Sequence, residues 1–143
     1  MDRGFLIAQL ELHEDRRKKA YTDEYGNVTV GVGRNLTGKG LSDAEIDFLL
    51  SNDIDEVLAD LETFPWWASL DPVRQMVVAD MRFNLGPTRF RFFKRMLTAL
   101  GEGDYQKAAA SMRQSKWYQQ VRSRGVRLVK MMQRGMAEEG VGQ

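Results

Sequence analysis

Strand-like patterning occurs in one short segment of this chain, residues 19–34, and the longer part that follows is patterned for helices. Residues 28–33 read Val-Thr-Val-Gly-Val-Gly, so three valines alternate with a threonine and two glycines. This alternation predicts a strand with one buried apolar face. The opposite face is nearly bare backbone, which another group can approach closely. Asp23 to Asn27 has the composition of a turn and predicts an earlier strand paired with this one.

Helical patterning accounts for most of the remaining residues. Apolar residues at steps of three and four predict a helix over residues 3–13 that ends near Glu14. Ser42-Asp-Ala-Glu45 is a capping box and predicts a long helix over about 42–62. Asp71-Pro72 predicts the start of another helix, which should stop at Gly86-Pro87. Further helices are expected around residues 90–100, 104–114 and 122–134.

Strands limited to one small segment, with helices elsewhere, indicate an α+β fold. The length of 143 residues suits a single domain. We expect this domain to comprise a small antiparallel sheet lobe, a connecting helix and a larger helical lobe. The expected bounds are about 14–41 for the sheet lobe, about 42–62 for the connecting helix, and about 63–143 plus the N-terminal helix for the helical lobe.

The formal net charge of +1 hides a strong division along the chain. Residues 1–81 contain 8 Lys/Arg and 16 Asp/Glu, whereas residues 82–134 contain 13 Lys/Arg and 2 Asp/Glu. The basic segment suggests a polyanionic partner, which could be nucleic acid, an anionic membrane surface or an anionic cell-wall polymer. The chain has no cysteine and one histidine, so disulfides and multi-histidine metal sites are excluded and neither metal nor cofactor is expected.

The early apolar run Phe5–Ala8 is too short for a signal-peptide core or a membrane span. We therefore expect synthesis in the cytoplasm without a signal peptide and without stable insertion in a membrane.

Three side chains suited to acid–base chemistry fall within sixteen residues: Glu14, Asp23 and Thr29. Each also has an ordinary structural interpretation, as a solvated helix end, a turn-closing residue and a strand former. Glu14 should lie at the negative end of a helix dipole, which favours the protonated acid, while Asp23 in a polar turn should stay ionised. Two carboxyl groups in contrasting environments are the arrangement used for glycoside hydrolysis.

The segment Leu10-Glu-Leu-His-Glu14-Asp-Arg-Arg-Lys-Lys-Ala-Tyr21-Thr-Asp23, followed by Thr29-Val-Gly31-Val-Gly33, closely resembles the catalytic segment of phage T4-type lysozymes. These are the muramidase endolysins of glycoside hydrolase family 24. The spacing is Glu, eight residues, Asp, five residues, Thr. Met81–Gly86, Ser115–Tyr118, Arg124 and Arg127 resemble the helical-lobe signatures of the same family. The resemblance implies a lysozyme-like fold with an active-site cleft between the two lobes.

The resemblance also implies roles for individual residues. Glu14 is expected to be the general acid. Asp23, helped by Thr29, is expected to hold and activate the attacking water, with inversion at the anomeric carbon. An inverting pair of carboxyl groups is separated by roughly 6.5–9.5 Å to leave room for that water. Tyr21 flanks the motif, and Arg124 matches an arginine that pairs with the catalytic glutamate across the cleft.

Substrate-binding candidates follow from the same comparison. Phe83 matches a substrate-contacting aromatic residue. Asn35, Met96 and Ser111 fall at cleft positions, although their types depart from the T4 pattern. Arg34 stands where the T4 pattern has a histidine, and Asp53 corresponds to the partner of that histidine. We therefore predict an Arg34–Asp53 ion pair that ties the sheet lobe to the long helix.

The implied function is that of a monomeric muramidase without a cofactor, which cleaves the β-1,4 bond between N-acetylmuramic acid and N-acetylglucosamine in bacterial peptidoglycan. The implied setting is lysis of a bacterial host by a phage, with dependence on a pore-forming holin for access to the periplasm or cell wall. A tail-borne lysozyme is an alternative setting. In this interpretation nucleic acid is not a partner. The alternative function is a non-catalytic module that binds the cell wall or nucleic acid through the basic segment 82–134.

Overall fold

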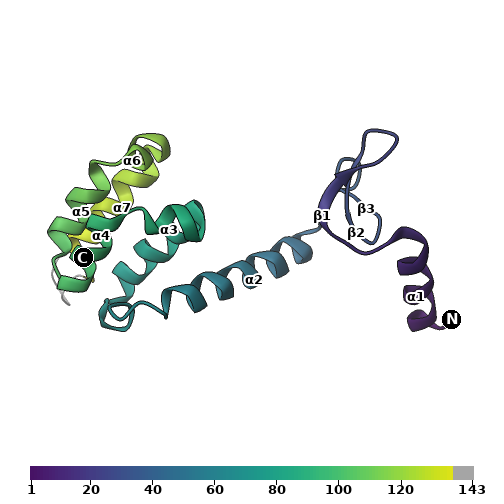
Figure 1. The fold of residues 1–143 in the computed structure, drawn as a ribbon, viewed down its shortest axis with the longest axis horizontal. Coiled ribbons are helices and arrows are strands. Elements are labelled where there is room, and N and C mark those ends of the chain that lie inside the picture. The colour runs from purple at the N-terminus through teal and green to yellow at the C-terminus, as the bar shows by residue number, and fades with distance from the viewer. Residues whose placement is uncertain (137–143) are drawn as a thin grey trace. The chain divides into compact units, whose positions relative to one another are not determined.

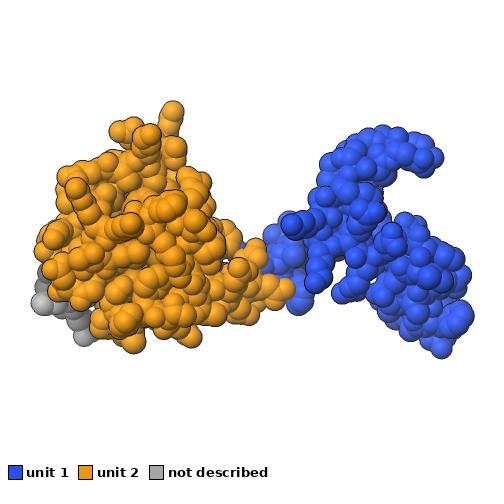
Figure 2. Space-filling view, in the orientation of Figure 1, with its two compact units in different colours: residues 1–50 blue, residues 51–143 orange. Residues whose placement is uncertain are grey.

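The structure, a computed structural model, describes residues 1–136 of the chain. It divides into two compact units, Met1–Leu50 and Ser51–Gln143, which are described one at a time (Figure 2). The element types confirm the predicted α+β class, with seven α-helices and a three-stranded antiparallel sheet among the described residues. The union of sheet lobe, connecting helix and helical lobe in one domain stays a prediction.

The first unit contains a helix, the sheet and the start of a long helix (Figure 1). Its elements are α1 (Arg3–Glu14), β1 (Arg17–Thr22), β2 (Val28–Gly31), β3 (Arg34–Asn35) and the beginning of α2 (Asp43–Leu61). The side chain of Asp2 caps α1 by accepting a hydrogen bond from the Phe5 N–H at 2.9 Å. The predicted capping box begins α2, because Ser42 Oγ accepts from the Glu45 N–H at 3.2 Å and Glu45 Oε1 accepts from the Ser42 N–H at 2.8 Å.

The side chains of β2 are buried in the opposite sense from the prediction. Thr29 is only 5% exposed, whereas Val28 is 39% exposed and Val30 is partly buried. Thr29 lies directly opposite Tyr21 of β1 and Asn35 of β3, and directly opposed residues share a face of the sheet. The short threonine therefore lies between two larger side chains in the central strand, which explains its burial.

The second unit is entirely helical. After the end of α2 its elements are η1 (Trp67–Ser69), α3 (Pro72–Arg91), α4 (Lys94–Glu102), α5 (Tyr105–Arg113), α6 (Lys116–Val121) and α7 (Ser123–Arg134). The helices expected around residues 90–100, 104–114 and 122–134 correspond to α4, α5 and α7. The short helix α6 was not predicted as a separate element.

The helix α3 starts as predicted and then continues past its predicted end. Asp71 caps it, because its Oδ1 accepts hydrogen bonds from the Val73 and Arg74 N–H groups, each at 3.1 Å. At Gly86 the backbone leaves the helix, with φ 80° and ψ 170°, which only glycine adopts readily. Pro87 then begins another helical turn, a position that suits proline because its missing N–H is not needed there.

The second unit has a continuous apolar core. Its buried side chains come from α2, α3, α4, α5, α6, α7 and the segment that joins α2 to α3. The fully or nearly fully buried large members are Leu61, Val77, Val78, Met81, Phe90, Met96, Leu100, Met112 and Met132. This core fixes the helices on which the residues implied by the family resemblance lie.

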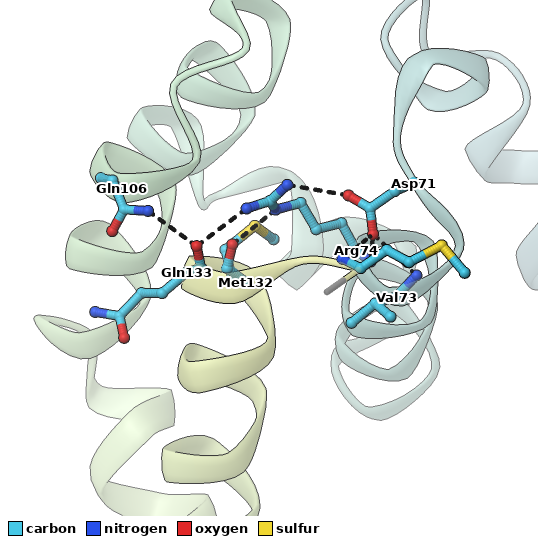
Figure 3. Close-up of polar contacts among 7 residues, drawn as sticks. Asp71, Val73, Arg74, Gln106, Met132 and Gln133 are labelled. Carbon is cyan, nitrogen blue, oxygen red and sulfur yellow. Dashed lines mark hydrogen bonds and ion pairs between the residues drawn. The ribbon is translucent and has the colours of Figure 1, made fainter. Parts of the chain in front are cut away.

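Arg74 holds the end of α7 against the start of α3 (Figure 3). Its Nε donates to the Met132 carbonyl at 2.7 Å and its Nη2 donates to the Gln133 carbonyl at 3.1 Å. Its Nη1 lies 3.0 Å from Asp71 Oδ2, and its guanidinium lies 3.9 Å from the centre of the Tyr105 ring. The arginine therefore satisfies carbonyl groups that the last turn of a helix leaves without partners.

Asp60 anchors the last turn of α2 to α3. Its Oδ2 accepts from Arg82 Nε at 2.6 Å, and its Oδ1 accepts from Arg91 Nη2 at 2.6 Å. Arg82 is 5% exposed, so the carboxylate is the ionic partner of a buried cation. The hydrogen bond from Arg91, with the help of Arg82, lowers the pKa of Asp60 to about 2.

Within residues 1–136, none of the helices is both long enough and apolar enough to span a membrane.

Candidate active site

The row of side chains centred on Thr29 brings together three residues singled out from the sequence. In the ladder of the sheet, Thr29 pairs with Tyr21 on one side and with Asn35 on the other. The guanidinium of Arg17 lies 4.5 Å from the centre of the Tyr21 ring, so β1 contributes a cation and an aromatic ring beside this row. Thr29 Oγ1 donates to the Asn27 carbonyl at 3.4 Å. The sheet therefore places a hydroxyl, a phenol and an amide on one face.

Asp23 closes the hairpin between β1 and β2. Its Oδ1 accepts hydrogen bonds from the Asn27 N–H at 2.8 Å and from the Tyr25 N–H at 2.9 Å. Its own N–H donates to the Asn27 carbonyl at 2.8 Å. The hydrogen bond from the Asn27 N–H is the largest cause that lowers the pKa of Asp23 below its usual value. The carboxylate is thus ionised near neutral pH, as expected from the sequence, and its position is set by the turn.

Glu14 is the last residue of α1, and its carboxylate lies against the backbone of Gly33. A Cβ atom at Gly33 would be 3.0 Å from Glu14 Oε2, and Gly33 has a φ of +69°. Any other side chain at position 33 would therefore be strained and would press on the carboxylate. The close approach predicted for the glycine-rich strand segment thus occurs within the chain itself, and the approaching group is Glu14.

The residue after Glu14 has an unusual backbone conformation. Asp15 has φ 64° and ψ 175°, a region that is populated almost only by glycine. Such a conformation costs about 1–3 kcal/mol in a residue with a side chain. This sharp change of direction ends α1 at Glu14 and starts the path into β1.

Arg34 pairs with Glu45, a partner that was not predicted, whereas the predicted ion pair with Asp53 of the second unit stays a prediction. Arg34 Nη1 lies 2.7 Å from Glu45 Oε1, and Arg34 Nη2 lies 2.5 Å from Glu45 Oε2. The hydrogen bond from Arg34 lowers the pKa of Glu45 to about 2. Glu45 is held in position for this pair by its capping bond with Ser42 in the first turn of α2.

A cavity of about 580 Å³ lies beside the sheet in the first unit. Its walls are formed by residues 30–35 together with Lys39, Leu41 and Glu45. Gly33, which lies against Glu14, and Asn35, which belongs to the polar row of the sheet, both line this space. The first unit therefore offers a hollow lined by the Arg34–Glu45 ion pair, the cation of Lys39 and the amide of Asn35.

The substrate-binding candidates of the second unit differ in accessibility. Phe83 on α3 is 45% exposed, and Ser111 on α5 is partly buried and lines a separate pocket. Met96 is fully buried, which contradicts its assignment to a cleft position. Met96 lies on the inward face of α4 with Ala99 and Leu100, three and four residues later, so its side chain belongs to the core.

Arg124 has an ionic partner within the second unit. Its Nε donates to Asp80 Oδ1 at 2.8 Å, and its Nη2 lies 2.6 Å from the same oxygen. Both side chains remain about 40% exposed, at 42% and 38%. The pairing of Arg124 with the catalytic glutamate, implied by the family resemblance, stays a prediction.

Comparison with protein families decides the class of this chain. The model of the family described as phage lysozyme matches residues 11–138. The chain belongs to this family. The match spans the hairpin segment with Glu14, Asp23 and Thr29 as well as the helices of the second unit. It confirms the prediction of a lysozyme-like α+β fold and that of a glycoside hydrolase of the lysozyme type.

Individual relatives agree with this family. The chain is 28% identical to the pre-baseplate central spike protein Gp5 of Enterobacteria phage T4, over 93% of this chain and 28% of that protein. It is 23% identical to probable T4-type lysozyme 2 of Dictyostelium discoideum, over 94% of this chain and 96% of the relative. It is 22% identical to probable T4-type lysozyme 1 of the same organism, over 88% of this chain and 92% of the relative.

The chain thus spans about a quarter of the spike protein and nearly all of each Dictyostelium lysozyme. A phage lysozyme acts on peptidoglycan, so the coarse function is that of a muramidase-type peptidoglycan hydrolase.

Sequence reasoning overlooked two contributions to the site. Glu45 was recognised only as a helix-capping residue, although its second oxygen holds Arg34. Asn27 was read only as a turn residue, although its N–H is the main partner of Asp23. The turn composition of residues 23–27 could have indicated the hydrogen bond between Asn27 and Asp23. The capping box identified Glu45 as a residue of the first turn of α2, but it gave no signal that Glu45 also binds Arg34.

Proposed function

We propose that this lysozyme hydrolyses the β-1,4 bond between N-acetylmuramic acid and N-acetylglucosamine, with inversion at the anomeric carbon. The observation that carries the proposal is the arrangement of the hairpin: an ionised Asp23 fixed by backbone N–H groups, next to a strand whose central Thr29 is buried between Tyr21 and Asn35. The family motif with its Glu, Asp and Thr spacing falls on these elements.

Glu14 is the general acid in this proposal. Its proton passes to the glycosidic oxygen as the bond from that oxygen to the anomeric carbon breaks. A water molecule attacks the anomeric carbon from the opposite side of the sugar, and its proton passes to Asp23. Asp23 suits the role of base because its Oδ1 is occupied by two backbone N–H groups, which keep the carboxylate ionised and leave Oδ2 for the water.

Thr29 and its neighbours position the reacting groups. The buried hydroxyl of Thr29 donates to the Asn27 carbonyl and can accept a hydrogen bond from the attacking water. Tyr21 and Asn35 keep that hydroxyl in place from the two adjacent strands. Asn35, Phe83 and Ser111 are the proposed substrate contacts, and Arg124 is proposed to stabilise the charge of Glu14 when the substrate is bound.

Product analysis tests the chemistry of this proposal. Digestion of purified peptidoglycan should produce new reducing ends on N-acetylmuramic acid, and proton NMR of the first products should show the α-anomer before mutarotation. New reducing ends on N-acetylglucosamine or 1,6-anhydro products would overturn the bond assignment. A β-anomer as the first product would overturn inversion.

We propose that the biological setting is lysis of a bacterial host, with a monomeric enzyme that reaches the wall after a holin opens the membrane. Co-expression in bacteria tests this: lysis should require the holin, and the purified protein should sediment as a monomer. The likeness to a phage spike protein favours a second setting, a lysozyme borne on the virion. Detection of the chain in purified virions would support that setting against the first.

A further inference from the structure

The strand β1 has an irregularity that the catalytic assignment does not explain. Arg17 of β1 lies opposite Gly31 of β2. Tyr21 lies opposite Thr29, so four residue steps along β1 correspond to only two along β2. The two additional residues of β1 form a bulge between Arg17 and Tyr21. Bulges are common next to active sites, where they redirect side chains.

The bulge brings Arg17 close to Tyr21. In a regular strand, residues four apart are separated by about 13 Å and residues two apart by about 7 Å. Arg17 and Tyr21 pair with positions of β2 that are two apart, so their side chains lie on the same face at about the shorter separation. The guanidinium of Arg17 therefore reaches the Tyr21 ring and lies 4.5 Å from its centre.

Tyr21 links this guanidinium to the buried threonine. The other residues of β1 are exposed, whereas Tyr21 is partly buried. Along the strand, its ring receives the cation of Arg17. Across the sheet, its directly opposed neighbour is Thr29, which is only 5% exposed. Directly opposed side chains pack against each other, so the position of the ring affects the position of Thr29.

The ring is the contact that the structure provides for the charge of Arg17. The neighbouring Arg16 pairs with Glu11 at 3.0 Å. Arg17 itself takes part in none of the ion pairs of residues 1–136. Arginine suits this contact, because its planar guanidinium stacks on aromatic faces and stays charged at neutral pH. No carboxylate of the described residues therefore competes with the ring for this side chain.

We propose that Arg17 is a positioning residue for the hydrolytic reaction. It holds the Tyr21 ring against Thr29, and the ring limits the rotation of the threonine side chain. The hydroxyl of Thr29, which donates to the Asn27 carbonyl at 3.4 Å, then presents its lone pairs to the attacking water in a constant direction. This inference rests on the proposed function, because it adds a residue that acts through Thr29.

Kinetics of Arg17 variants on purified peptidoglycan test this role. Arg17→Gln should lower kcat about two- to fivefold, the effect of losing an exposed cation–π contact, with KM little changed. Arg17→Lys keeps a cation that can lie over the ring and should recover most of the lost rate. The matched control is Lys18→Gln, which removes the same charge from an exposed neighbour on β1 and should leave kcat and KM unchanged. Equal effects of Arg17→Gln and Lys18→Gln would mean general charge attraction and would overturn the inference.

A double-mutant cycle separates positioning from general destabilisation. If Arg17 acts through Thr29, Arg17→Gln should change kcat by less than about 1.5-fold when Thr29→Ala is already present. The full loss in both backgrounds would overturn the inference, because Arg17 would then act independently of Thr29. Tyr21→Leu removes the ring and should abolish the effect of Arg17→Gln in the same way, which provides a second cycle if Thr29→Ala does not fold.

NMR of the full chain tests the geometry without reference to activity. The side-chain Hδ protons of Arg17 should be shifted upfield by the Tyr21 ring and should show nuclear Overhauser effects to its ring protons. Random-coil shifts for these protons, without Overhauser effects to the ring, would overturn the contact and the inference with it.

Glu14→Gln distinguishes failure of this inference from failure of the proposed function. If Glu14→Gln and Thr29→Ala both clear peptidoglycan at the normal rate, the proposed function fails and the role of Arg17 fails with it. If both are inactive while Arg17→Gln keeps the normal kcat, the proposed function stands and only the role of Arg17 is overturned.

Discussion

The two units of this lysozyme are built on different physical principles. The second unit packs a core of 19 buried apolar side chains, from Val57 to Met132. In the first unit only one residue is buried to the same extent. This residue is Thr29, which is polar. Its geometry is set by backbone hydrogen bonds at Asp23, by the glycine against Glu14 and by the Arg34–Glu45 pair. Stability is concentrated in one unit, whereas the candidate catalytic groups lie in the other.

The largest expected effect comes from separating the units. A fragment of residues 42–143 contains the whole core and should keep its helices and a cooperative melting transition. A fragment of residues 1–50 has no apolar core of its own and should be largely unfolded. Circular dichroism and amide NMR spectra of both fragments check this. A dispersed NMR spectrum from residues 1–50 alone would show that the first unit folds independently and would contradict the claim that stability is concentrated in the second unit.

The second-largest effect is expected at Asp60, which forms ion pairs with Arg82 and Arg91 in the second unit. Asp60→Asn removes the partner of the buried Arg82 and should lower the free energy of unfolding by about 2 kcal/mol, between the values for surface and buried ion pairs. Urea denaturation of both proteins at pH 7 measures the difference.

The same pair predicts a pH dependence. The folded-state pKa of Asp60 is lowered from 3.8 to about 2. Its stabilisation is therefore present above pH 4 and is lost as the pH falls from about 4 to 2. The difference in stability between the unaltered protein and Asp60→Asn should shrink over this interval. A difference that stays constant down to pH 2 would contradict the role of the ionised carboxylate.

The smallest effect is expected at Asp15 in the first unit. Its φ of 64° and ψ of 175° are strained for any residue with a side chain, so Asp15→Gly should raise the free energy of unfolding by about 1 kcal/mol. Asp15→Ala keeps the strain and serves as the control for loss of the carboxylate. Equal stabilities for the glycine and alanine variants, measured by thermal melting, would show that the backbone of Asp15 is relaxed.

Sequence patterns predicted the elements that are fixed locally. The capping box at Ser42, the Asp71-Pro72 start and the turn at Asp23 each depend on hydrogen bonds between residues close in the chain, and each appears in the structure. The two-residue strand β3 was not expected, because a strand so short has no periodicity to detect. The break at Gly86 was predicted, but the helical turn that Pro87 restarts was not.

Features that depend on tertiary neighbours were predicted less well. The valine face of β2 was expected to be buried, but the burial of Thr29 depends on Tyr21 and Asn35 in adjacent strands. Met96 was assigned to a cleft, but the packing of α4 places it in the core. The pair between Arg34 and Glu45 was not predicted, because it depends on how β3 meets the first turn of α2.

The central claim is that the first unit performs the chemistry through Glu14, and one substitution tests it most directly. Glu14→Gln should keep the melting temperature of the unaltered protein, because the carboxylate is exposed and has no hydrogen-bond partner among the described residues. It should lose clearance of purified peptidoglycan by a factor of about 10² to 10⁴, the usual contribution of a general acid. Glu24→Gln, at an exposed residue beside Asp23, is the matched control and should retain full activity. Clearance by Glu14→Gln at the normal rate would contradict the account.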